Sequence, residues 1–180
     1  MFHHVKAVMI LSVVAVFAAC SSGSFDSQKS TQTAVPPISV QLWSVKDFIK
    51  SDFKGTLKAI ASMGFEGVEF AGEYGPYKHD PVGLKAYLTS IDLKVSGIHV
   101  GLGQLRWKNL DKTIDFAKKL GAKMIIIPAA TEAWTGEGID RLIEELTQLT
   151  MSLGKHGLVL GYHNHKQEFE DYKDSTFGIT

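Results

Sequence analysis

The residues best suited to chemistry lie in one stretch, Leu158 to Phe169. The apolar run Leu-Val-Leu-Gly-Tyr is followed at once by His163, Asn164 and His165, and Glu168 comes shortly after. Imidazole and carboxylate groups bind divalent metal ions, and imidazoles also exchange protons near neutral pH. A buried strand that ends in such groups predicts a metal or catalytic site at its carboxyl end.

Side chains alternate along a β-strand, so residues two apart share a face. Gly161, His163 and His165 would therefore face one way, while Leu160 and Tyr162 face the other. The leucine face would be covered by helices. Both imidazoles would then point to the opposite side of the sheet.

Three earlier apolar runs show the same alternation. The first sets Gln41 and Trp43 against Val40 and Leu42, the second sets Glu69 against Val68 and Phe70, and the third sets Val95, Gly97 and His99 against Ser96 and Ile98. One face is aliphatic, and the other carries small residues followed by a polar one. A doubly wound sheet would be aliphatic on both faces. We therefore expect a barrel whose interior gathers Gln41, Glu69, His99 and His163.

The chain from Ile38 onward reads as a βα repeat of roughly 30 residues. Strands are expected to begin near Ser39, Gly67, Lys94, Met124 and Leu158, and helices to cover 52–63, 81–91, 110–120 and 139–153. The loops after strands are long, and this is the end where parallel α/β folds bind ligands. Residues 38–180 thus predict an α/β fold of the (β/α)8 TIM barrel type with about five βα units. A full barrel takes about 250 residues, so we expect either three further units beyond Thr180 or an open sheet with an exposed edge.

All three tryptophans, Trp43, Trp107 and Trp134, fall at strand ends or in the long loops. Aromatic faces beside polar groups suit the C–H faces of a sugar ring, so we assign these residues to substrate binding. The alternative is that they are lids packed on the core. Gln41 could likewise serve packing alone.

The composition narrows the function classes. Lysine plus arginine and aspartate plus glutamate balance at 19 each, which gives no indication of a nucleic-acid partner. Cys20 is the single cysteine, so an internal disulfide and a cysteine-based zinc cluster are excluded. Any metal would have to be held by histidine and carboxylate.

The N-terminus reads as an export signal. A short, weakly basic start precedes an apolar run that is shorter than the roughly 20 residues needed to span a bilayer. The ending Phe-Ala-Ala-Cys resembles a bacterial lipobox, which implies cleavage before Cys20 and acylation of its thiol. We therefore expect a signal peptide at 1–19, a flexible tether at 20–37 and a lipid-anchored protein of the cell envelope or periplasm. A secreted protein and an uncleaved anchor are the alternatives.

Four segments together resemble the sugar phosphate isomerase/epimerase family of xylose-isomerase-like TIM barrels. They are Val40–Asp47, Met63–Gly72, Ser96–Val100 and Tyr162–Phe169. The resemblance implies a small carbohydrate substrate and a divalent ion, manganese, magnesium, cobalt or zinc. It also implies removal of a proton next to a carbonyl group to give an enediolate.

The resemblance assigns roles to individual residues. His163 stands where the family commonly has a glutamate ligand that also acts as base, so it is our metal ligand and catalytic residue. Glu69 and His99 would be catalytic groups beside the sugar hydroxyls, and His165 and Glu168 would contact substrate. The rival readings are a hydrogen-bonded core histidine for His163 and a helix first-turn carboxylate for Glu168.

Three classes of function remain open. The first is a metal-dependent carbohydrate isomerase or epimerase, with a sugar lyase or dehydratase as its variant because His163 adds no negative charge. The second is a non-catalytic sugar-binding envelope lipoprotein. The third is a related barrel acting on damaged DNA, which the balanced charge and the export signal disfavour.

Overall fold

The computed structural model describes residues 35–170. The predicted signal peptide, the lipidation site Cys20 and most of the predicted tether lie outside this range. Residues 35–37 are exposed and form neither helix nor strand. No helix of the described part is long and apolar enough to cross a membrane.

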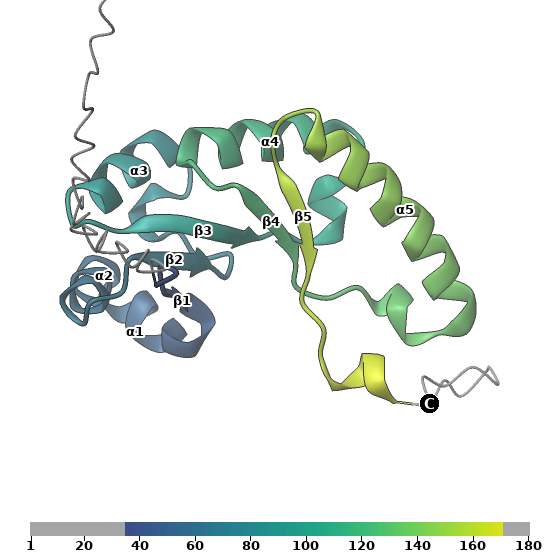
Figure 1. The fold of residues 1–180 in the computed structure, drawn as a ribbon, viewed down its shortest axis with the longest axis horizontal. Helices are drawn as coiled ribbons and strands as arrows, with labels where there is room; N and C mark the ends of the chain where they lie inside the picture. Colours follow the sequence, from purple (N-terminus) through teal and green to yellow (C-terminus); the bar gives the residue numbers. More distant parts are fainter. Residues whose placement is uncertain (1–34, 171–180) are drawn as a thin grey trace, which may run out of the picture. The chain divides into compact units, whose positions relative to one another are not determined.

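Within residues 35–170, five parallel strands lie side by side in chain order, with β1 and β5 at the sheet edges. The strands are β1 (Ser39–Gln41), β2 (Gly67–Phe70), β3 (Lys94–His99), β4 (Met124–Ile127) and β5 (Val159–Tyr162). The helices are α1 (Lys46–Ser51), α2 (Phe53–Ser62), α3 (Pro81–Thr89), α4 (Lys108–Leu120) and α5 (Gly136–Gly154) (Figure 1). The predicted βα repeat is confirmed, and the short helix α1 is the element that the sequence pattern missed.

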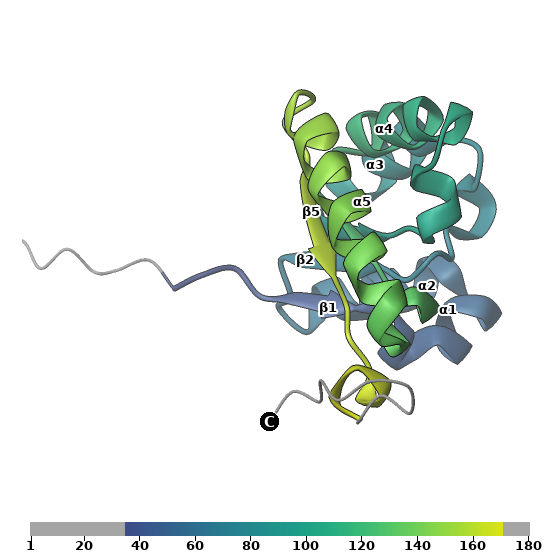
Figure 2. The ribbon, with the colours of Figure 1, turned by 90° about the vertical axis from the view of Figure 1, so that its right-hand side faces the viewer.

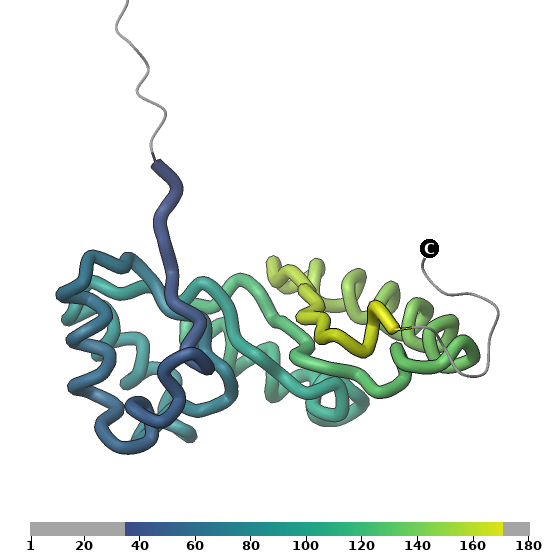
Figure 3. The backbone as a smooth tube through the Cα atoms, turned by 90° about the horizontal axis from the view of Figure 1, so that it is seen from below, coloured from purple at the N-terminus to yellow at the C-terminus, as the bar shows by residue number. Residues whose placement is uncertain are grey.

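Each strand is followed by a short 3-10 turn at the end where the predicted site lies. These turns are η1 (Leu42–Val45), η2 (Gly75–Tyr77), η3 (Leu102–Leu105), η4 (Thr131–Trp134) and η5 (Lys166–Phe169). The tube view shows the units following one another from purple to yellow (Figure 3). The strand-to-helix loops are therefore ordered turns at one edge of the sheet.

One face of the sheet is buried under the helices, as the alternation predicts. Val68, Phe70, Ile98, Ile125 and Ile127 are fully buried in a core shared with the helices. Figure 2 shows α1 to α4 on one side of the strands. Burial of each such side chain stabilises the fold by about 1.5–3 kcal/mol, so this face fixes which side chains point the other way.

Small residues on the opposite face make room for one large neighbour. A Cβ atom added to Gly97 would lie 2.9 Å from Ile126 Cδ1, and one added to Gly161 would lie 3.4 Å from Ile126 Cγ1. Ile126 therefore fills the space beside both glycines. This is how the inner face packs below the polar strand ends.

A register shift in β3 corrects one expectation. Val68 pairs with Val95, whereas Glu69 pairs with Gly97, so Ser96 is an extra residue in β3. Val95 accordingly shares the face of Val68 and packs against the core, and its assignment to the inner face is wrong. The bulge restores the phase, so Gly97 and His99 keep their expected orientation.

Side-chain caps begin helices α2 and α3. Asp52 accepts a hydrogen bond from the Gly55 N–H, and Asp80, just before Pro81, accepts one from the Gly83 N–H, each at 2.8 Å. At the other end of α4, Gly121 adopts the left-handed conformation with φ 89°. These caps define the lengths of the helices and hence the positions of the loops.

Replacing Leu153 with alanine should lower the free energy of unfolding by about 2–4 kcal/mol, because its fully buried side chain joins α5 to the core. The matched control is Met151→Ala on the same helix, where the side chain is 60% exposed and the expected change is below about 0.5 kcal/mol. Urea unfolding followed by circular dichroism measures both variants. Equal losses would show that α5 does not pack as described.

Candidate active site

A cavity of about 320 Å³ lies at the carboxyl ends of the strands. Predicted site residues from three strands and the turns after them line it: Gln41 at the end of β1 and Trp43 in η1, His99 at the end of β3, and His163 and His165 after β5. These residues are up to 124 positions apart in the sequence, roughly the span of four βα units. The fold thus brings together most of the side chains that sequence reasoning selected.

His99 and Glu69 form the most closely held pair in the site. His99 Nε2 lies 2.8 Å from Glu69 Oε1, and the two side chains are only 8% and 25% exposed. A carboxylate this close favours the tautomer in which Nε2 carries the proton and donates it. Glu69 therefore fixes the orientation of the His99 ring and accepts a hydrogen bond itself.

The three imidazoles form a row across the inner face. The ring centres of His99 and His163 are 5.5 Å apart, and those of His163 and His165 are 4.8 Å apart. His163 is exposed, and its backbone N–H donates to Ile127 O at 2.9 Å, which anchors the strand end. The alternative of a buried core histidine does not describe it.

Gln41 and Trp43 have local structural partners at the edge of the cavity. Gln41 Oε1 accepts a hydrogen bond from the Trp43 N–H at 2.8 Å and so caps η1. Lys46 Nζ lies 5.4 Å from the centre of the Trp43 ring. The ring itself is 61% exposed, so one aromatic surface beside the cavity remains open to a ligand.

Trp107 and Trp134 lie away from this cavity. Trp134 is partly buried and packs against the core, which corresponds to the lid alternative. Trp107 is 87% exposed and lines a different groove, beside α5. The structure therefore leaves Trp43 as the tryptophan that adjoins the histidines.

Glu168 is occupied by protein donors. It accepts hydrogen bonds from Tyr162 Oη at 2.7 Å and from the His165 N–H at 2.8 Å, and Tyr162 Oη in turn accepts from the Ala130 N–H at 3.3 Å. Burial raises the pKa of Glu168, but these hydrogen bonds outweigh it and hold the pKa below its ordinary value. Burial and the Glu168 hydrogen bond raise the pKa of Tyr162 to about 12. Glu168 thus positions the segment that carries His163 and His165.

The described residues do not form a complete metal site. Within residues 35–170, no three histidine, cysteine, aspartate or glutamate side chains are placed so that they could hold one ion together. His163 and His165 can offer imidazole nitrogens to an ion at the mouth of the cavity, whereas Glu69 is committed to His99. The ligand assignment of His163 stays a prediction.

Sequence reasoning missed an ion-pair network beside the site. Arg106 Nε and Nη2 each lie 2.6 Å from a carboxylate oxygen of Glu145, and Nη2 also lies 3.2 Å from Glu132. The hydrogen bonds to Glu145 raise the pKa of Arg106 above its ordinary value. These residues tie the loop after β3 to η4 and α5. Their separation along the chain left no signal in the sequence.

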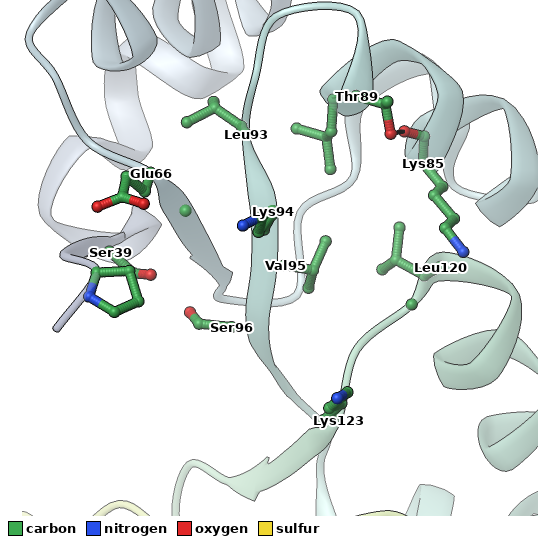
Figure 4. Close-up of a pocket in the computed structure, with 14 residues that line it drawn as sticks. Ser39, Glu66, Lys85, Thr89, Leu93, Lys94, Val95, Ser96, Leu120 and Lys123 are labelled. Atoms are coloured by element: carbon green, nitrogen blue, oxygen red, sulfur yellow. Dashed lines mark hydrogen bonds between the residues drawn. The ribbon is translucent and has the colours of Figure 1, made fainter. Parts of the chain in front are cut away.

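A second cavity, of about 420 Å³, lies at the opposite end of the strands (Figure 4). Apolar side chains such as Leu88, Leu93 and Leu120 line it, with Lys94 and Lys123 nearby. It lies among the amino ends of the strands and the carboxyl ends of α3 and α4. Lysine is favoured beside helix carboxyl ends, so the helix termini account for its charge without a ligand.

Comparisons with known proteins identify the fold. Residues 57–177 match the family model described as xylose isomerase-like TIM barrel. A sugar phosphate isomerase/epimerase from Parabacteroides distasonis has a similar structure, with TM-score 0.60 and 21% identity over 84% of this chain and 59% of that chain. An AP endonuclease of family 2 from Brucella melitensis gives TM-score 0.54 and 18% identity over 71% of this chain and 55% of that chain. A probable 3-DHS dehydratase from Bacillus anthracis gives TM-score 0.51 and 15% identity over 69% of this chain and 51% of that chain.

These likenesses confirm the predicted barrel-type fold, with four βα units and a fifth strand in the described part. This chain spans less than two thirds of the length of each of those structures. At identities below 25%, they establish the fold alone. A comparison with curated proteins finds no match.

Replacing Tyr162 with phenylalanine should lower the free energy of unfolding at neutral pH by about 1–3 kcal/mol, because Glu168 and the Ala130 N–H both lose a partner. The lowered pKa of Glu168 means that its contribution is complete above the ordinary value of 4.5 and is lost as the pH falls through the lower folded-state value. In the variant the folded-state pKa moves back toward 4.5, so less stability is lost in acid. Urea unfolding at a series of acidic pH values measures this.

Tyr87→Phe is the control for that measurement, because Tyr87 Oη donates to the neutral Lys54 carbonyl at 2.9 Å. This variant should lower the free energy of unfolding by an amount that stays the same at every pH below neutrality. An unchanged acid dependence in Tyr162→Phe would contradict the role of Tyr162 in holding Glu168.

Proposed function

This chain belongs to the xylose isomerase-like TIM barrel family, and we propose that it is an isomerase or epimerase of a small carbohydrate. The reaction would begin with removal of a proton from a carbon next to a carbonyl group. The observation that carries the proposal is the His99–Glu69 pair facing His163 across the cavity at the strand ends. Such groups give proton transfer without a nucleophile or a nucleotide cofactor.

In the proposed reaction, Glu69 holds the His99 ring, and His99 Nδ1 accepts a hydrogen bond from a hydroxyl group of the sugar. His163 removes the proton from the adjacent carbon, and the electron pair passes to the carbonyl oxygen to form an enediolate. Return of the proton to the other carbon gives an isomer, and return to the opposite face of the same carbon gives an epimer. His165 and the exposed face of Trp43 would bind the remainder of the sugar.

We further propose a divalent cation, Mn, Mg, Co or Zn, with His163 as one ligand. A neutral imidazole has one free lone pair, so with the ion bound to His163 the proton would be removed by the neighbouring His165. Three ligating side chains do not converge within residues 35–170, so the other ligands would come from outside the described part of the chain or from the substrate. No step above is routed through the ion. Its presence is tested independently below.

Elimination is the second candidate chemistry. His163 is a neutral base where the family commonly has a carboxylate, and after the same proton removal a β-hydroxyl could leave as water. The product would be a dehydrated sugar in place of an isomer. A non-catalytic sugar-binding protein would show neither outcome, and the assay below separates the three.

Incubation of the chain with simple aldoses and ketoses in D₂O should replace the proton next to the carbonyl with deuterium, because the removed proton exchanges with solvent. Proton NMR follows the loss of that signal and reveals any dehydrated product. His163→Ala and Glu69→Gln should each slow exchange by about 10²–10⁴-fold. His156→Ala, an exposed histidine beyond the other end of α5, is the matched control and should not change the rate.

The same preparations test the ion. We expect the unaltered chain to bind about one divalent ion, and His163→Ala to weaken binding by more than about tenfold, measured by calorimetric titration with Mn²⁺. Unchanged affinity would remove His163 from the ligand set. Absence of exchange for every sugar, with sugar binding retained, would favour the non-catalytic reading.

We also propose export and lipid anchoring at Cys20 to the bacterial cell envelope, from the apolar segment and lipobox-like ending of the sequence. Bacteria that express the protein and are fed radiolabelled palmitate should label it, and Cys20→Ser should abolish the label. Cys20→Ser should also move the protein from the membrane to the soluble fraction. Label that persists in Cys20→Ser would overturn the lipid anchor.

A further inference from the structure

Trp107 stands out in both exposure and backbone conformation. Its side chain is 87% exposed, the most open of the large hydrophobic side chains between residues 35 and 170. Its φ of 48° and ψ of −132° belong to a region that residues other than glycine seldom adopt. Such conformations are costly and are kept at sites where they position a side chain for binding.

The residue before it explains how this conformation is maintained. Arg106 makes two hydrogen bonds of 2.6 Å to Glu145 in α5, and its backbone O accepts one from the Asn109 N–H at 3.2 Å. The Asn109 side chain also donates to Gly103 O at 3.3 Å. The chain is thus fixed on both sides of Trp107. The ring is presented by a hydrogen-bonded loop, away from the cavity that holds the histidines.

The ring borders a groove of about 530 Å³ between the start of α4 and the outer face of α5. Arg141, Glu144, Gln148 and Ser152 line it at successive turns of α5. Within the described residues, no hydrogen bond occupies the side chains of Glu144 and Gln148. The groove therefore offers one open aromatic face beside a row of planar polar groups.

This combination indicates the class of ligand. The lining carries both signs of charge, which suits neither a polyanion nor a strongly basic peptide. Its leucines, Leu105, Leu110 and Leu149, are buried or half-buried and give little open apolar area for a protein partner. A neutral sugar ring has C–H faces for an indole and vicinal hydroxyls for guanidinium, carboxylate and amide groups.

We propose that the Trp107 groove is a binding site for a neutral carbohydrate chain, separate from the cavity at the strand ends. A sugar ring stacks on Trp107, and its hydroxyls hydrogen-bond to Glu144, to Gln148 and to the Arg141 nitrogens other than Nη1, which donates to Glu137 at 3.1 Å. The proposal does not depend on the reaction proposed above. Binding in this groove would attach the protein to a polysaccharide while the cavity at the strand ends remains open.

Calorimetric titration of the full chain with neutral pentasaccharides of glucose, xylose and mannose tests this site. At least one should bind, and Trp107→Ala should weaken that binding by about tenfold or more. Trp107→Gly should weaken binding equally without lowering the midpoint of thermal unfolding, because glycine adopts this backbone conformation without strain. Phe48→Ala, which removes another exposed aromatic ring, and His163→Ala should leave the affinity unchanged.

Three results would overturn the proposal. The first is that no pentasaccharide binds at millimolar concentration, and the second is that Trp107→Ala binds as tightly as the unaltered chain. The third is a dimer, seen by sedimentation velocity, that Trp107→Ala converts to a monomer, because the groove would then be an interface between two copies. Weakened binding in His163→Ala would place the sugar in the other cavity and count equally against it.

Discussion

The site depends on one constraint, the burial of a single face of a parallel sheet. Phe70, Ile98 and Ile125 must face the helices, because exposing any of them would cost a large share of the few kcal/mol by which a domain is stable. Alternation then leaves Glu69 and His99 facing the other way. Parallel strands end at the same edge, so polar residues at strand ends meet there.

The inner face is held less tightly than the outer one. Ile126 fills the space beside Gly97 and Gly161. Met124, two residues before Ile126 in β4, is 39% exposed, and Val159, two residues before Gly161 in β5, is 55% exposed. Polar contacts therefore carry more of the local order near the strand ends. The Glu69–His99 pair and the Tyr162–Glu168 hydrogen bond provide it, and both are stronger where water is partly excluded.

The sequence predicts this fold well where periodicity carries the information. The strands and four longer helices follow from the alternation and the βα repeat, and the convergence of His99 and His163 follows from topology. The bulge at Ser96 could not be predicted from the sequence, because one extra residue in a strand leaves the local composition unchanged. Substrate binding is the prediction for Trp134 and Glu168, but Trp134 packs against the core and Glu168 accepts a hydrogen bond from Tyr162. No local sequence pattern encodes these two contacts.

Arg106 shows how a residue without a sequence signature can determine what the loops present. It joins the turn after β3 to Glu132 in η4 and to Glu145 in α5, so three segments at this edge are linked by one side chain. Trp107 follows directly, and its exposed ring can keep a costly backbone conformation only while that anchor holds. The histidine cavity, in contrast, is built on strand ends. The chain thus presents two ligand-accessible surfaces that depend on different interactions, so one can change without the other.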